Sequence, residues 1–333
     1  MTKKCAFCSN TKFRNVLNLG RQPLANSYLS NNSEFKFEKK VKLSLEMCLS
    51  CKLCQVPHNI YPKDFFLNYD YLSGASTTWI KHCKDFSQHV IEKYSLDNKN
   101  GEIIEIASND GILLNFFKKK NFKVVGIEPS VNAVKIARKN NIRSIIDFFD
   151  YKFSKKNKSN FNPQLIIANN VIAHIKNLNS FVKGLHEISN NKTLICIEIP
   201  HIYNLYMKSQ FDTIYHEHHY YYSLHTLKKI LEKFNINIVD VELIKTHGGS
   251  LRIFAKKNFI PRKKIQSIEK ILKKEKSLKI DSVSCQKKFR SKVLKIKKNS
   301  LNLIKKIKKN KKVIDAYGAA AKGNTMLNYL GIR

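Results

Sequence analysis

The chain has 333 residues, enough for about two domains of ordinary size, and its 43% hydrophobic content excludes a largely disordered or low-complexity protein. No apolar run approaches the roughly 18 residues of a membrane helix and the N-terminus has no signal peptide, so we expect a cytoplasmic protein without a membrane partner. The formal net charge of +36 indicates an anionic partner, although abundant Lys, Asn and Ile equally indicate a bias in the composition of the whole chain.

Two CxxC pairs lie near the N-terminus, Cys5 with Cys8 and Cys48 with Cys51, and 39 residues separate them. Two thiolates three positions apart on a tight turn can bind one metal, and two such turns complete a tetrahedral four-cysteine zinc site. In a cytosolic chain a metal is favoured over disulfides. Such a site leaves no open coordination position, so we predict a structural role. Cys54 could replace Cys51 as the fourth ligand, and the spacing leaves this alternative open.

A nucleotide-binding βαβ unit is predicted from residue 102 onward. An apolar strand over 102–107 leads into a turn, 108–111, and after a short helix a second strand, 124–128, ends in Glu128. A tight turn lets a ligand approach the first strand, and an acid after the second strand binds ribose hydroxyls. The GxGxxG fingerprint is absent, and Asp110 in the turn would repel a pyrophosphate. Because that acid suits a ligand with an amino group and a sulfonium, the pattern favours S-adenosylmethionine over NAD, with any other doubly wound fold as the alternative.

Five further strands follow in the sequence. Three of them continue the parallel sheet and the last two form an antiparallel hairpin, over residues 143–146, 164–168, 193–199, 235–244 and 250–255. Five parallel strands followed by an antiparallel hairpin is the order of the class I methyltransferases. The strand order therefore predicts an α/β fold of this class.

The densest polar cluster lies between the fifth strand and the hairpin. Residues 215–222 contain three histidines, one glutamate and four tyrosines, which are poor core material. A second metal site is one interpretation. Catalysis is favoured, because neutral imidazole is a competent base near neutral pH and a neighbouring carboxylate can orient it.

Residues 256–312 hold 23 Lys or Arg against three acids, with apolar residues at roughly helical spacing. This pattern predicts one or two amphipathic helices with a lysine-coated outer face. A solvated face is favoured over a nucleic-acid stripe, because Phe259 and Phe289 are the only aromatic residues available for stacking.

Eight motifs lie along the chain, with the two CxxC pairs counted as one. They are the two CxxC pairs, 18–26 (NLGRQPLAN), 69–74 (YDYLSG), 105–111 (EIASNDG), 170–174 (NVIAH), 215–218 (YHEH), 246–252 (THGGSLR) and 317–323 (YGAAAKG). Together they resemble the nucleotide-sugar C-methyltransferases, which use S-adenosylmethionine to add a methyl branch to a 4-keto deoxysugar. Each motif alone is weak, but eight in order are very specific, and the resemblance covers essentially the whole chain.

The resemblance implies a class I methyltransferase Rossmann-like sheet with a small N-terminal zinc-binding domain and an incomplete C-terminal Rossmann-like domain. It places the zinc ligands on Cys5, Cys8, Cys48 and Cys51, and Cys54 falls where the family has an ordinary apolar residue. The implied parts are 1–70, zinc-binding; 71–256, methyltransferase; 257–312, basic helical; and 313–333, the start of the last domain. That last domain would begin with a strand over 313–317, and the family domain runs on further, so a truncated chain is expected.

The cofactor and the reaction follow from the same resemblance. Residues expected to bind S-adenosylmethionine are Glu105, Ala107, Asn109, Asp110, Gly111, Glu128, Pro129 and Asn169. Ala107 stands where the family usually has glycine, which would either tighten the approach of the cofactor or weaken its binding.

The implied reaction is C-methylation of a nucleotide-linked 4-keto deoxysugar through a base-generated enolate, in branched-sugar biosynthesis. His218 is expected to be the base, with Glu217 and Tyr215 ordering it or contacting sugar hydroxyls. His174 would donate toward sugar oxygens, and Tyr71 or Tyr69 would complete the pocket wall.

Two other functions remain as alternatives. One is a zinc-containing RNA methyltransferase that grips RNA with the lysine helices, and the other is an inactive truncated remnant of the sugar enzyme. The favoured hypothesis has a nucleotide-diphosphate sugar as substrate, no specific nucleic acid and no membrane as partner, and a monomeric chain.

Overall fold

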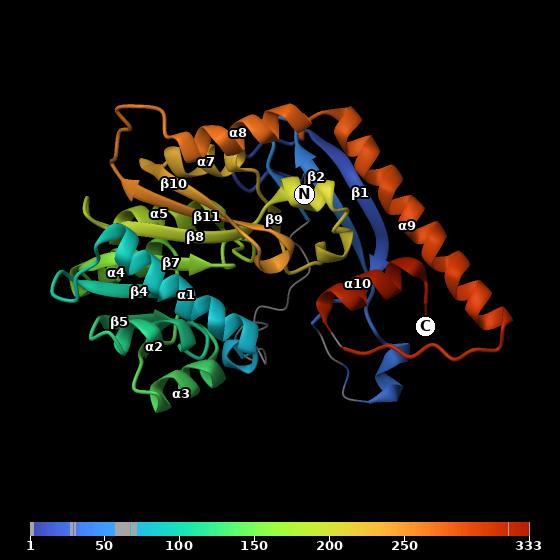
Figure 1. Cartoon of the computed structure of the whole chain (residues 1–333), viewed down its shortest axis with the longest axis horizontal. Coiled ribbons are helices and arrows are strands. Elements are labelled where there is room, and N and C mark those ends of the chain that lie inside the picture. The colour runs from blue at the N-terminus through green and yellow to red at the C-terminus, as the bar shows by residue number, and fades with distance from the viewer. Residues whose placement is uncertain are drawn as a thin grey trace.

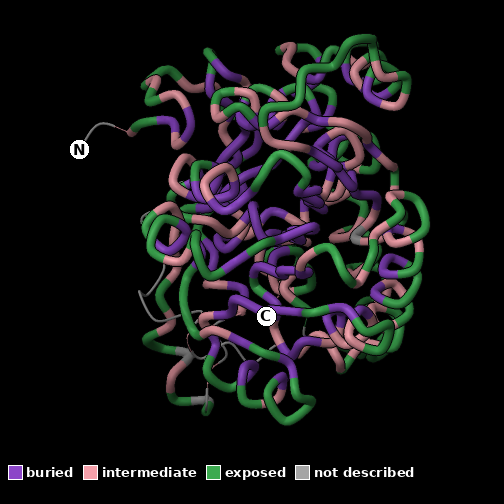
Figure 2. The backbone as a smooth tube through the Cα atoms, turned by 90° about the vertical axis from the view of Figure 1, so that its left-hand side faces the viewer, coloured by how far each residue is buried: buried purple, intermediate pink, exposed green. Residues whose placement is uncertain are grey.

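The structure, a computed structural model, describes residues 3–26, 29, 31–56, 67, 72–318 and 320–332. A seven-stranded sheet forms its centre, and a smaller four-stranded sheet lies beside it (Figure 1). Figure 2 shows the buried segments gathered inside and the exposed ones around them. None of the described helices combines the length and the apolar character that crossing a lipid bilayer requires.

The large sheet has the strand order β10-β11-β8-β7-β4-β5-β6. The five strands β4 to β8 run parallel, and β11 is antiparallel to both of its neighbours. The strands are β4 (Glu102–Ile106), β5 (Lys123–Ile127), β6 (Arg143–Ile145), β7 (Pro163–Asn169), β8 (Leu194–Pro200), β10 (Ile236–Ile244) and β11 (Ser250–Lys257). This order is that of a class I methyltransferase, so the predicted fold class is confirmed.

Helices cover both faces of this sheet because its strands are apolar on both faces. Alternate strand residues face opposite sides, so Ile103 packs in one core cluster with the first three helices, and Ile104 packs in another with later helices. On the first face lie α1 (Thr77–Tyr94), α2 (Ile112–Lys118) and α3 (Val131–Lys139). On the second lie α4 (Tyr151–Asn157), α5 (Leu178–Ile188), α7 (Leu224–Glu232) and α8 (Gln266–Leu278).

Short helical segments connect these elements. They are α6 (Ile202–Met207) and five 3-10 turns, η1 (Asn32–Lys36), η2 (Ser73–Ala75), η3 (Lys158–Asn160), η4 (Phe211–Thr213) and η5 (Thr246–Gly248). Helix starts follow capping chemistry: the side chain of Ser130 accepts a hydrogen bond from the backbone N–H of Ala133 at the start of α3.

The small antiparallel sheet has the order β1-β2-β3-β9. Three strands come from the N-terminal region, β1 (Phe13–Gln22), β2 (Val41–Cys48) and β3 (Cys54–Gln55), whereas β9 (Tyr220–Tyr221) belongs to the histidine-rich segment. In the register of β3 and β9, Cys54 lies opposite Tyr221 and Gln55 opposite Tyr220. The N-terminal sheet therefore contains part of the segment that carries the predicted base.

The basic region forms two helices, α8 and the long α9 (Val283–Lys309), as its pattern predicted. In Figure 1, α9 runs along β1, and the two elements are in contact. The inner face of α9 buries Phe289 against Tyr206, with ring centres 4.9 Å apart. One face of α9 therefore packs against the rest of the protein, and most of its lysines lie on the other face.

The predicted strand over 313–317 does not form. The described residues 311–318 carry no helix or strand, and Val313 and Tyr317 are exposed. A strand is stable only when its backbone pairs with a neighbour, and 313–317 has no such neighbour among the described residues. After this extended segment the chain folds back as α10 (Ala321–Leu330), which contacts α9, β1 and η4.

We predict that Phe289→Ala lowers the free energy of unfolding by about 3–5 kcal/mol, because it leaves a cavity where a fully buried ring packs. Leu294→Ala is the matched control on the same helix; its side chain is 55% exposed, and a change within about 0.5 kcal/mol is expected. Urea unfolding of both variants measures the difference. Equal effects would contradict the packing of α9 on the small sheet.

Candidate functional site

The four predicted zinc ligands come together in the structure. The sulfur atoms of Cys5, Cys8, Cys48 and Cys51 all lie within 4.8 Å of one another, and two of the sulfur pairs are 3.6 Å apart. Zinc–sulfur bonds of about 2.3 Å in a tetrahedron put sulfur atoms at such separations. The donor set and its spacing therefore fit one zinc ion.

Cys54 is not part of this cluster. Its sulfur lies 3.8 Å from the hydroxyl oxygen of Tyr206, in a separate buried core. The fourth ligand of the cluster is therefore Cys51, and Cys54, which the spacing alone had left possible, is excluded. The hydrogen bond between the sulfur atoms of Cys5 and Cys51 lowers the pKa of Cys5 to about 5.

The residue that follows each CxxC pair has the same kind of backbone conformation. Ser9 follows the first pair with φ 60°, and Lys52 follows the second with φ 68°, so both turns close through a left-handed residue. The first turn is fixed to the methyltransferase sheet by Asn179 of α5, whose side-chain amide donates to the carbonyls of Ala6 and Phe7 at 3.1 Å each. A metal here would stabilise the turn through which the N-terminal region contacts α5.

We predict one zinc ion per chain that is lost in Cys51→Ser and retained in Cys54→Ser, because only the first sulfur belongs to the cluster. Metal analysis of the reduced, purified proteins gives the stoichiometry. Full zinc in Cys51→Ser would overturn the assignment. The thermal midpoint of the wild type should also fall when a chelator removes the metal.

The predicted cofactor turn joins β4 to α2 and has an unusual backbone. Ala107, Asn109 and Gly111 all have positive φ angles, of 54°, 50° and 76°. The left-handed region costs an L-residue with a Cβ roughly 1–2 kcal/mol, which is the physical reason that glycine suits position 107. Alanine here adopts the backbone that glycine would adopt, so this departure from the family pattern leaves the shape of the turn intact.

Glu128, at the end of β5, is hydrogen-bonded to the turn. One carboxylate oxygen accepts from the N–H of Asn109 at 2.9 Å, and the other accepts from the N–H of Ser130, just after Pro129, at 2.8 Å. Burial nevertheless raises the pKa of Glu128, against these two hydrogen bonds. Each oxygen keeps a second lone pair, so the side chain can still accept from ribose hydroxyls.

Asp110 and Asn109 bind a neighbouring part of the chain. The carboxylate of Asp110 accepts from the N–H of Gly74 at 2.6 Å and from that of Ile112 at 3.3 Å. The side-chain oxygen of Asn109 accepts from the N–H of Ser73 at 2.9 Å. These bonds attach η2 to the cofactor turn, an arrangement that the sequence did not predict.

Several polar atoms at this edge are buried without a hydrogen-bond partner among the described residues. They belong to Glu105, Ser108 and Asn169, at or just after the carboxyl ends of the adjacent strands β4 and β7. Burial, together with the charges of Asp110 and Glu128, raises the pKa of Glu105 well above its usual value. Hydrogen-bonding groups of a ligand would supply partners for these buried polar atoms, and a positive charge on it would stabilise the nearby carboxylates. These residues therefore fit S-adenosylmethionine.

The histidine-rich segment holds the predicted base in one orientation. Nδ1 of His218 lies 3.2 Å from the carbonyl oxygen of Thr213, which can only accept, so Nδ1 carries the proton. Nε2 therefore has the lone pair, and it accepts from the hydroxyl of Tyr215 at 2.8 Å. The Thr213 carbonyl also accepts from the hydroxyl of Tyr221 at 3.1 Å. This is the tautomer that a base acting through Nε2 requires.

Other predicted residues surround this histidine. The ring of His174, from the turn after β7, lies 4.8 Å from that of His218, centre to centre. Burial lowers the pKa of His174 to about 4, so its ring is neutral near pH 7. The carboxylate of buried Glu217 accepts from the side-chain amide of Asn26 at 2.6 Å. Tyr71 lies outside the described residues.

Sequence reasoning missed Asn26 and Thr213 as members of this site. Asn26 ends the 18–26 motif, which was quoted only for its resemblance, and a search for polar partners of Glu217 would have pointed to it. Thr213 contributes a backbone carbonyl, for which no side-chain pattern exists.

Comparisons with known proteins cover almost the whole chain. Family models match residues 5–66 (zinc binding domain), 79–241 (methyltransferase domain) and 245–333 (C-methyltransferase C-terminal domain). The chain is also 25% identical over 330 residues to the C-methyltransferase NovU of Streptomyces niveus, covering 99% of this chain and 78% of that protein.

The chain belongs to the C-methyltransferase family. It is an S-adenosylmethionine-dependent C-methyltransferase with a zinc-binding N-terminal region, and both the family and the two cofactors expected from the sequence are confirmed.

Solved methyltransferase structures are also similar, at low identity. The magnesium protoporphyrin IX methyltransferase of Synechocystis with bound SAH is 11% identical, with a TM-score of 0.42 over 54% of this chain and 83% of that chain. An S-adenosylmethionine-dependent methyltransferase of Clostridium acetobutylicum is 14% identical, with a TM-score of 0.43 over 59% of this chain and 96% of that chain.

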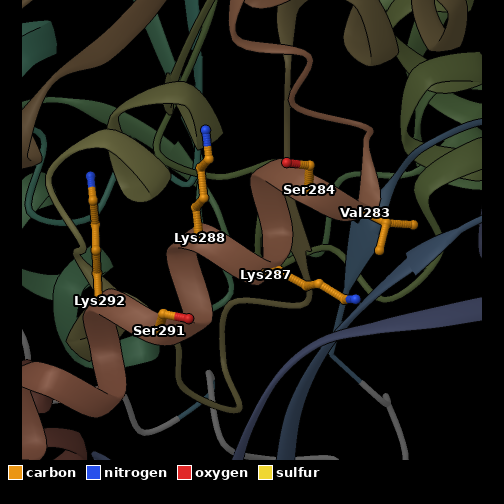
Figure 3. A pocket seen from close by; sticks show the side chains of 6 residues that line it. All are labelled: Val283, Ser284, Lys287, Lys288, Ser291 and Lys292. Atoms are coloured by element: carbon orange, nitrogen blue, oxygen red, sulfur yellow. The ribbon is translucent and has the colours of Figure 1, made fainter.

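This C-methyltransferase also has an open groove of about 710 Å³ along the start of α9, away from the strand ends (Figure 3). Figure 3 shows three lysine side chains extending from the helix beside two serines, and the lining is Val283, Ser284, Lys287, Lys288, Ser291 and Lys292. This lining has no aromatic ring on which a base could stack and no carboxylate or imidazole.

We predict that Asp110→Ala weakens binding of S-adenosylmethionine by about 10- to 100-fold, the range for losing hydrogen bonds to a buried charged group. The physical reason is that its carboxylate holds both η2 and the start of α2. Calorimetric titration with the cofactor measures the change. The control is Asp85→Ala, an exposed acid on α1 that should bind as the wild type does; unchanged affinity in Asp110→Ala would contradict the prediction.

Proposed function

We propose that this C-methyltransferase methylates a carbon next to the ketone of a nucleotide-linked 4-keto deoxysugar, through an enolate, in branched-sugar biosynthesis. The observation that carries the proposal is the fixed tautomer of His218, with Nδ1–H held by the Thr213 carbonyl and the lone pair on Nε2. The resemblance of the eight motifs to sugar enzymes supports the choice of substrate.

A base is the first requirement of this reaction. A carbon beside a ketone becomes nucleophilic only after its proton is removed, and Nε2 of His218 is the proposed acceptor of that proton. The hydroxyl of Tyr215 lies 2.8 Å from Nε2. When Nε2 takes the proton, this hydroxyl becomes available to donate to a substrate oxygen.

Stabilisation of the negative charge on the enolate oxygen is the second requirement. The ring of His174 is neutral because burial lowers its pKa to about 4, so it can donate one N–H to an oxygen near pH 7. Glu217, held by Asn26, is proposed to contact sugar hydroxyls beside it. Tyr71 is proposed to complete the pocket wall.

Placement of the methyl donor is the third requirement. S-adenosylmethionine supplies an electrophilic methyl group on a sulfonium. The residues proposed to hold it are Glu105, Ala107, Asn109, Asp110, Gly111, Glu128, Pro129 and Asn169, at the strand ends of β4, β5 and β7. Holding donor and acceptor in line supplies much of the rate.

We predict that His218→Gln loses methyl transfer by roughly 10²- to 10⁴-fold, the range for removing a general base, and still binds S-adenosylmethionine. The substrate is a 4-keto sugar nucleotide, and the product gains one methyl group by mass spectrometry. Without the methyl donor in D₂O, the wild type should exchange the proton next to the ketone and the variant should not.

His225→Gln, an exposed histidine on α7, serves as the matched control and should methylate normally. If His218→Gln exchanges and methylates normally while His174→Gln does neither, the base is the other histidine. If the wild type leaves every 4-keto sugar nucleotide unchanged, the proposed substrate is wrong.

A further inference from the structure

The carbonyl that fixes the tautomer of His218 belongs to a short turn that begins at buried Phe211 and is followed by buried Ile214. Thr213 ends the three-residue η4, and its carbonyl accepts from both His218 and Tyr221. The following residue, Ile214, donates its N–H to Phe211 and leads directly to Tyr215. A shift of this turn would move the hydrogen-bond acceptor at Nδ1 and the donor at Nε2 together.

Helix α10 covers this turn with one of its faces. Lys322, Thr325 and Tyr329 recur at the spacing that puts residues on the same side of a helix. The hydroxyl of Thr325, a residue only 1% exposed, donates to the Ile214 carbonyl at 3.3 Å. The ring of Tyr329 lies 5.2 Å from that of Phe211, centre to centre.

The third residue of this face, Lys322, acts on the turn through its charge. Burial raises the pKa of Asp212, in the middle of η4, and the ammonium of Lys322 opposes that shift. All three residues of η4 and the next one are thus near α10 or bonded to the catalytic segment. Three residues on one face of α10 therefore act on the same turn.

Helix α10 is in turn held by α9. The ammonium of Lys297 donates to the carbonyl of Tyr329 at 2.6 Å and lies 4.5 Å from the centre of the Tyr329 ring. The route from the basic helix to the proposed base therefore runs through α10 and η4, with each step a described contact.

We infer that α10 positions the base, with Thr325 as a positioning residue that fixes η4 and thereby the orientation and tautomer of His218. This inference rests on the proposed function of His218. It gives the residues after 320 a part in the reaction without any contact with the reacting atoms.

The test is Thr325→Val, which keeps the shape of the side chain and removes the hydroxyl. With ¹⁵N-histidine labelling, the wild type should show His218 with its proton on Nδ1, identified by the signal that His218→Gln loses. In Thr325→Val that single tautomer should be lost, and kcat should fall about 10-fold, as expected when a catalytic group is slightly misplaced. The affinity for S-adenosylmethionine should not change.

Thr325→Ser should restore both the tautomer and kcat, because it restores the hydroxyl. Leu327→Ala is the control on the opposite, exposed side of α10 and should behave as the wild type does. Tyr329→Leu, which removes the ring against Phe211, should repeat the effect of Thr325→Val by an independent contact.

A Thr325→Val protein with wild-type His218 signals would overturn the inference, whether or not its thermal midpoint falls, because that result leaves Thr325 a purely structural role. The NMR readout does not depend on turnover. If the wild type fails to methylate a 4-keto sugar nucleotide, the proposed function fails, and the tautomer measurement still decides whether α10 orients His218.

Discussion

Two residue pairs between β3 and β9 tie the segment of the proposed base to the cysteine-bearing sheet. The ladder continues where Val56 donates its N–H to the carbonyl of His219, and His219 donates its own N–H to the carbonyl of Ala173, in the turn after β7. The segment is thus bonded to the N-terminal sheet on one side and to the methyltransferase sheet on the other. The position of His218 over the strand ends depends on both sets of bonds.

This arrangement gives the four-cysteine cluster a structural consequence. The second CxxC pair ends just before β3, so a metal that fixes Cys48 and Cys51 also fixes the strand that pairs with β9. A closed four-sulfur site has no position for substrate, and its effect on catalysis would pass through this backbone ladder. The cluster and the proposed base are connected by the small sheet, although they perform different chemistry.

The sequence predicted the features that depend on local pattern. The strands of the large sheet are continuous apolar runs with turn residues between them, so their order could be read without a structure. The cysteine pairs were recognisable because their spacing is a property of single turns. The placement of Asp110 in the turn after the first strand and of Glu128 after the second also followed from position alone.

The features that the sequence did not predict depend on pairing between distant segments. The bond of Asn26 to Glu217 joins residues far apart in the chain, and so do the bonds of Asp110 to η2. In the strand expected over 313–317, local pattern alone was insufficient. Val313, Ile314 and Tyr317 are β-forming, but the described part of the chain offers no neighbouring strand to pair with them. Backbone acceptors such as the carbonyl of Thr213 leave no pattern in a sequence.

In the proposed reaction, the carbon next to a ketone receives the methyl group. The most direct measurement supplies S-adenosylmethionine with a ¹³C-labelled methyl group and a 4-keto sugar nucleotide, and locates the label in the product by NMR. A methyl signal on the ring carbon adjacent to the ketone is the expected result. A labelled methyl on oxygen or nitrogen, or a keto sugar that stays unlabelled while the cofactor is consumed elsewhere, would contradict it.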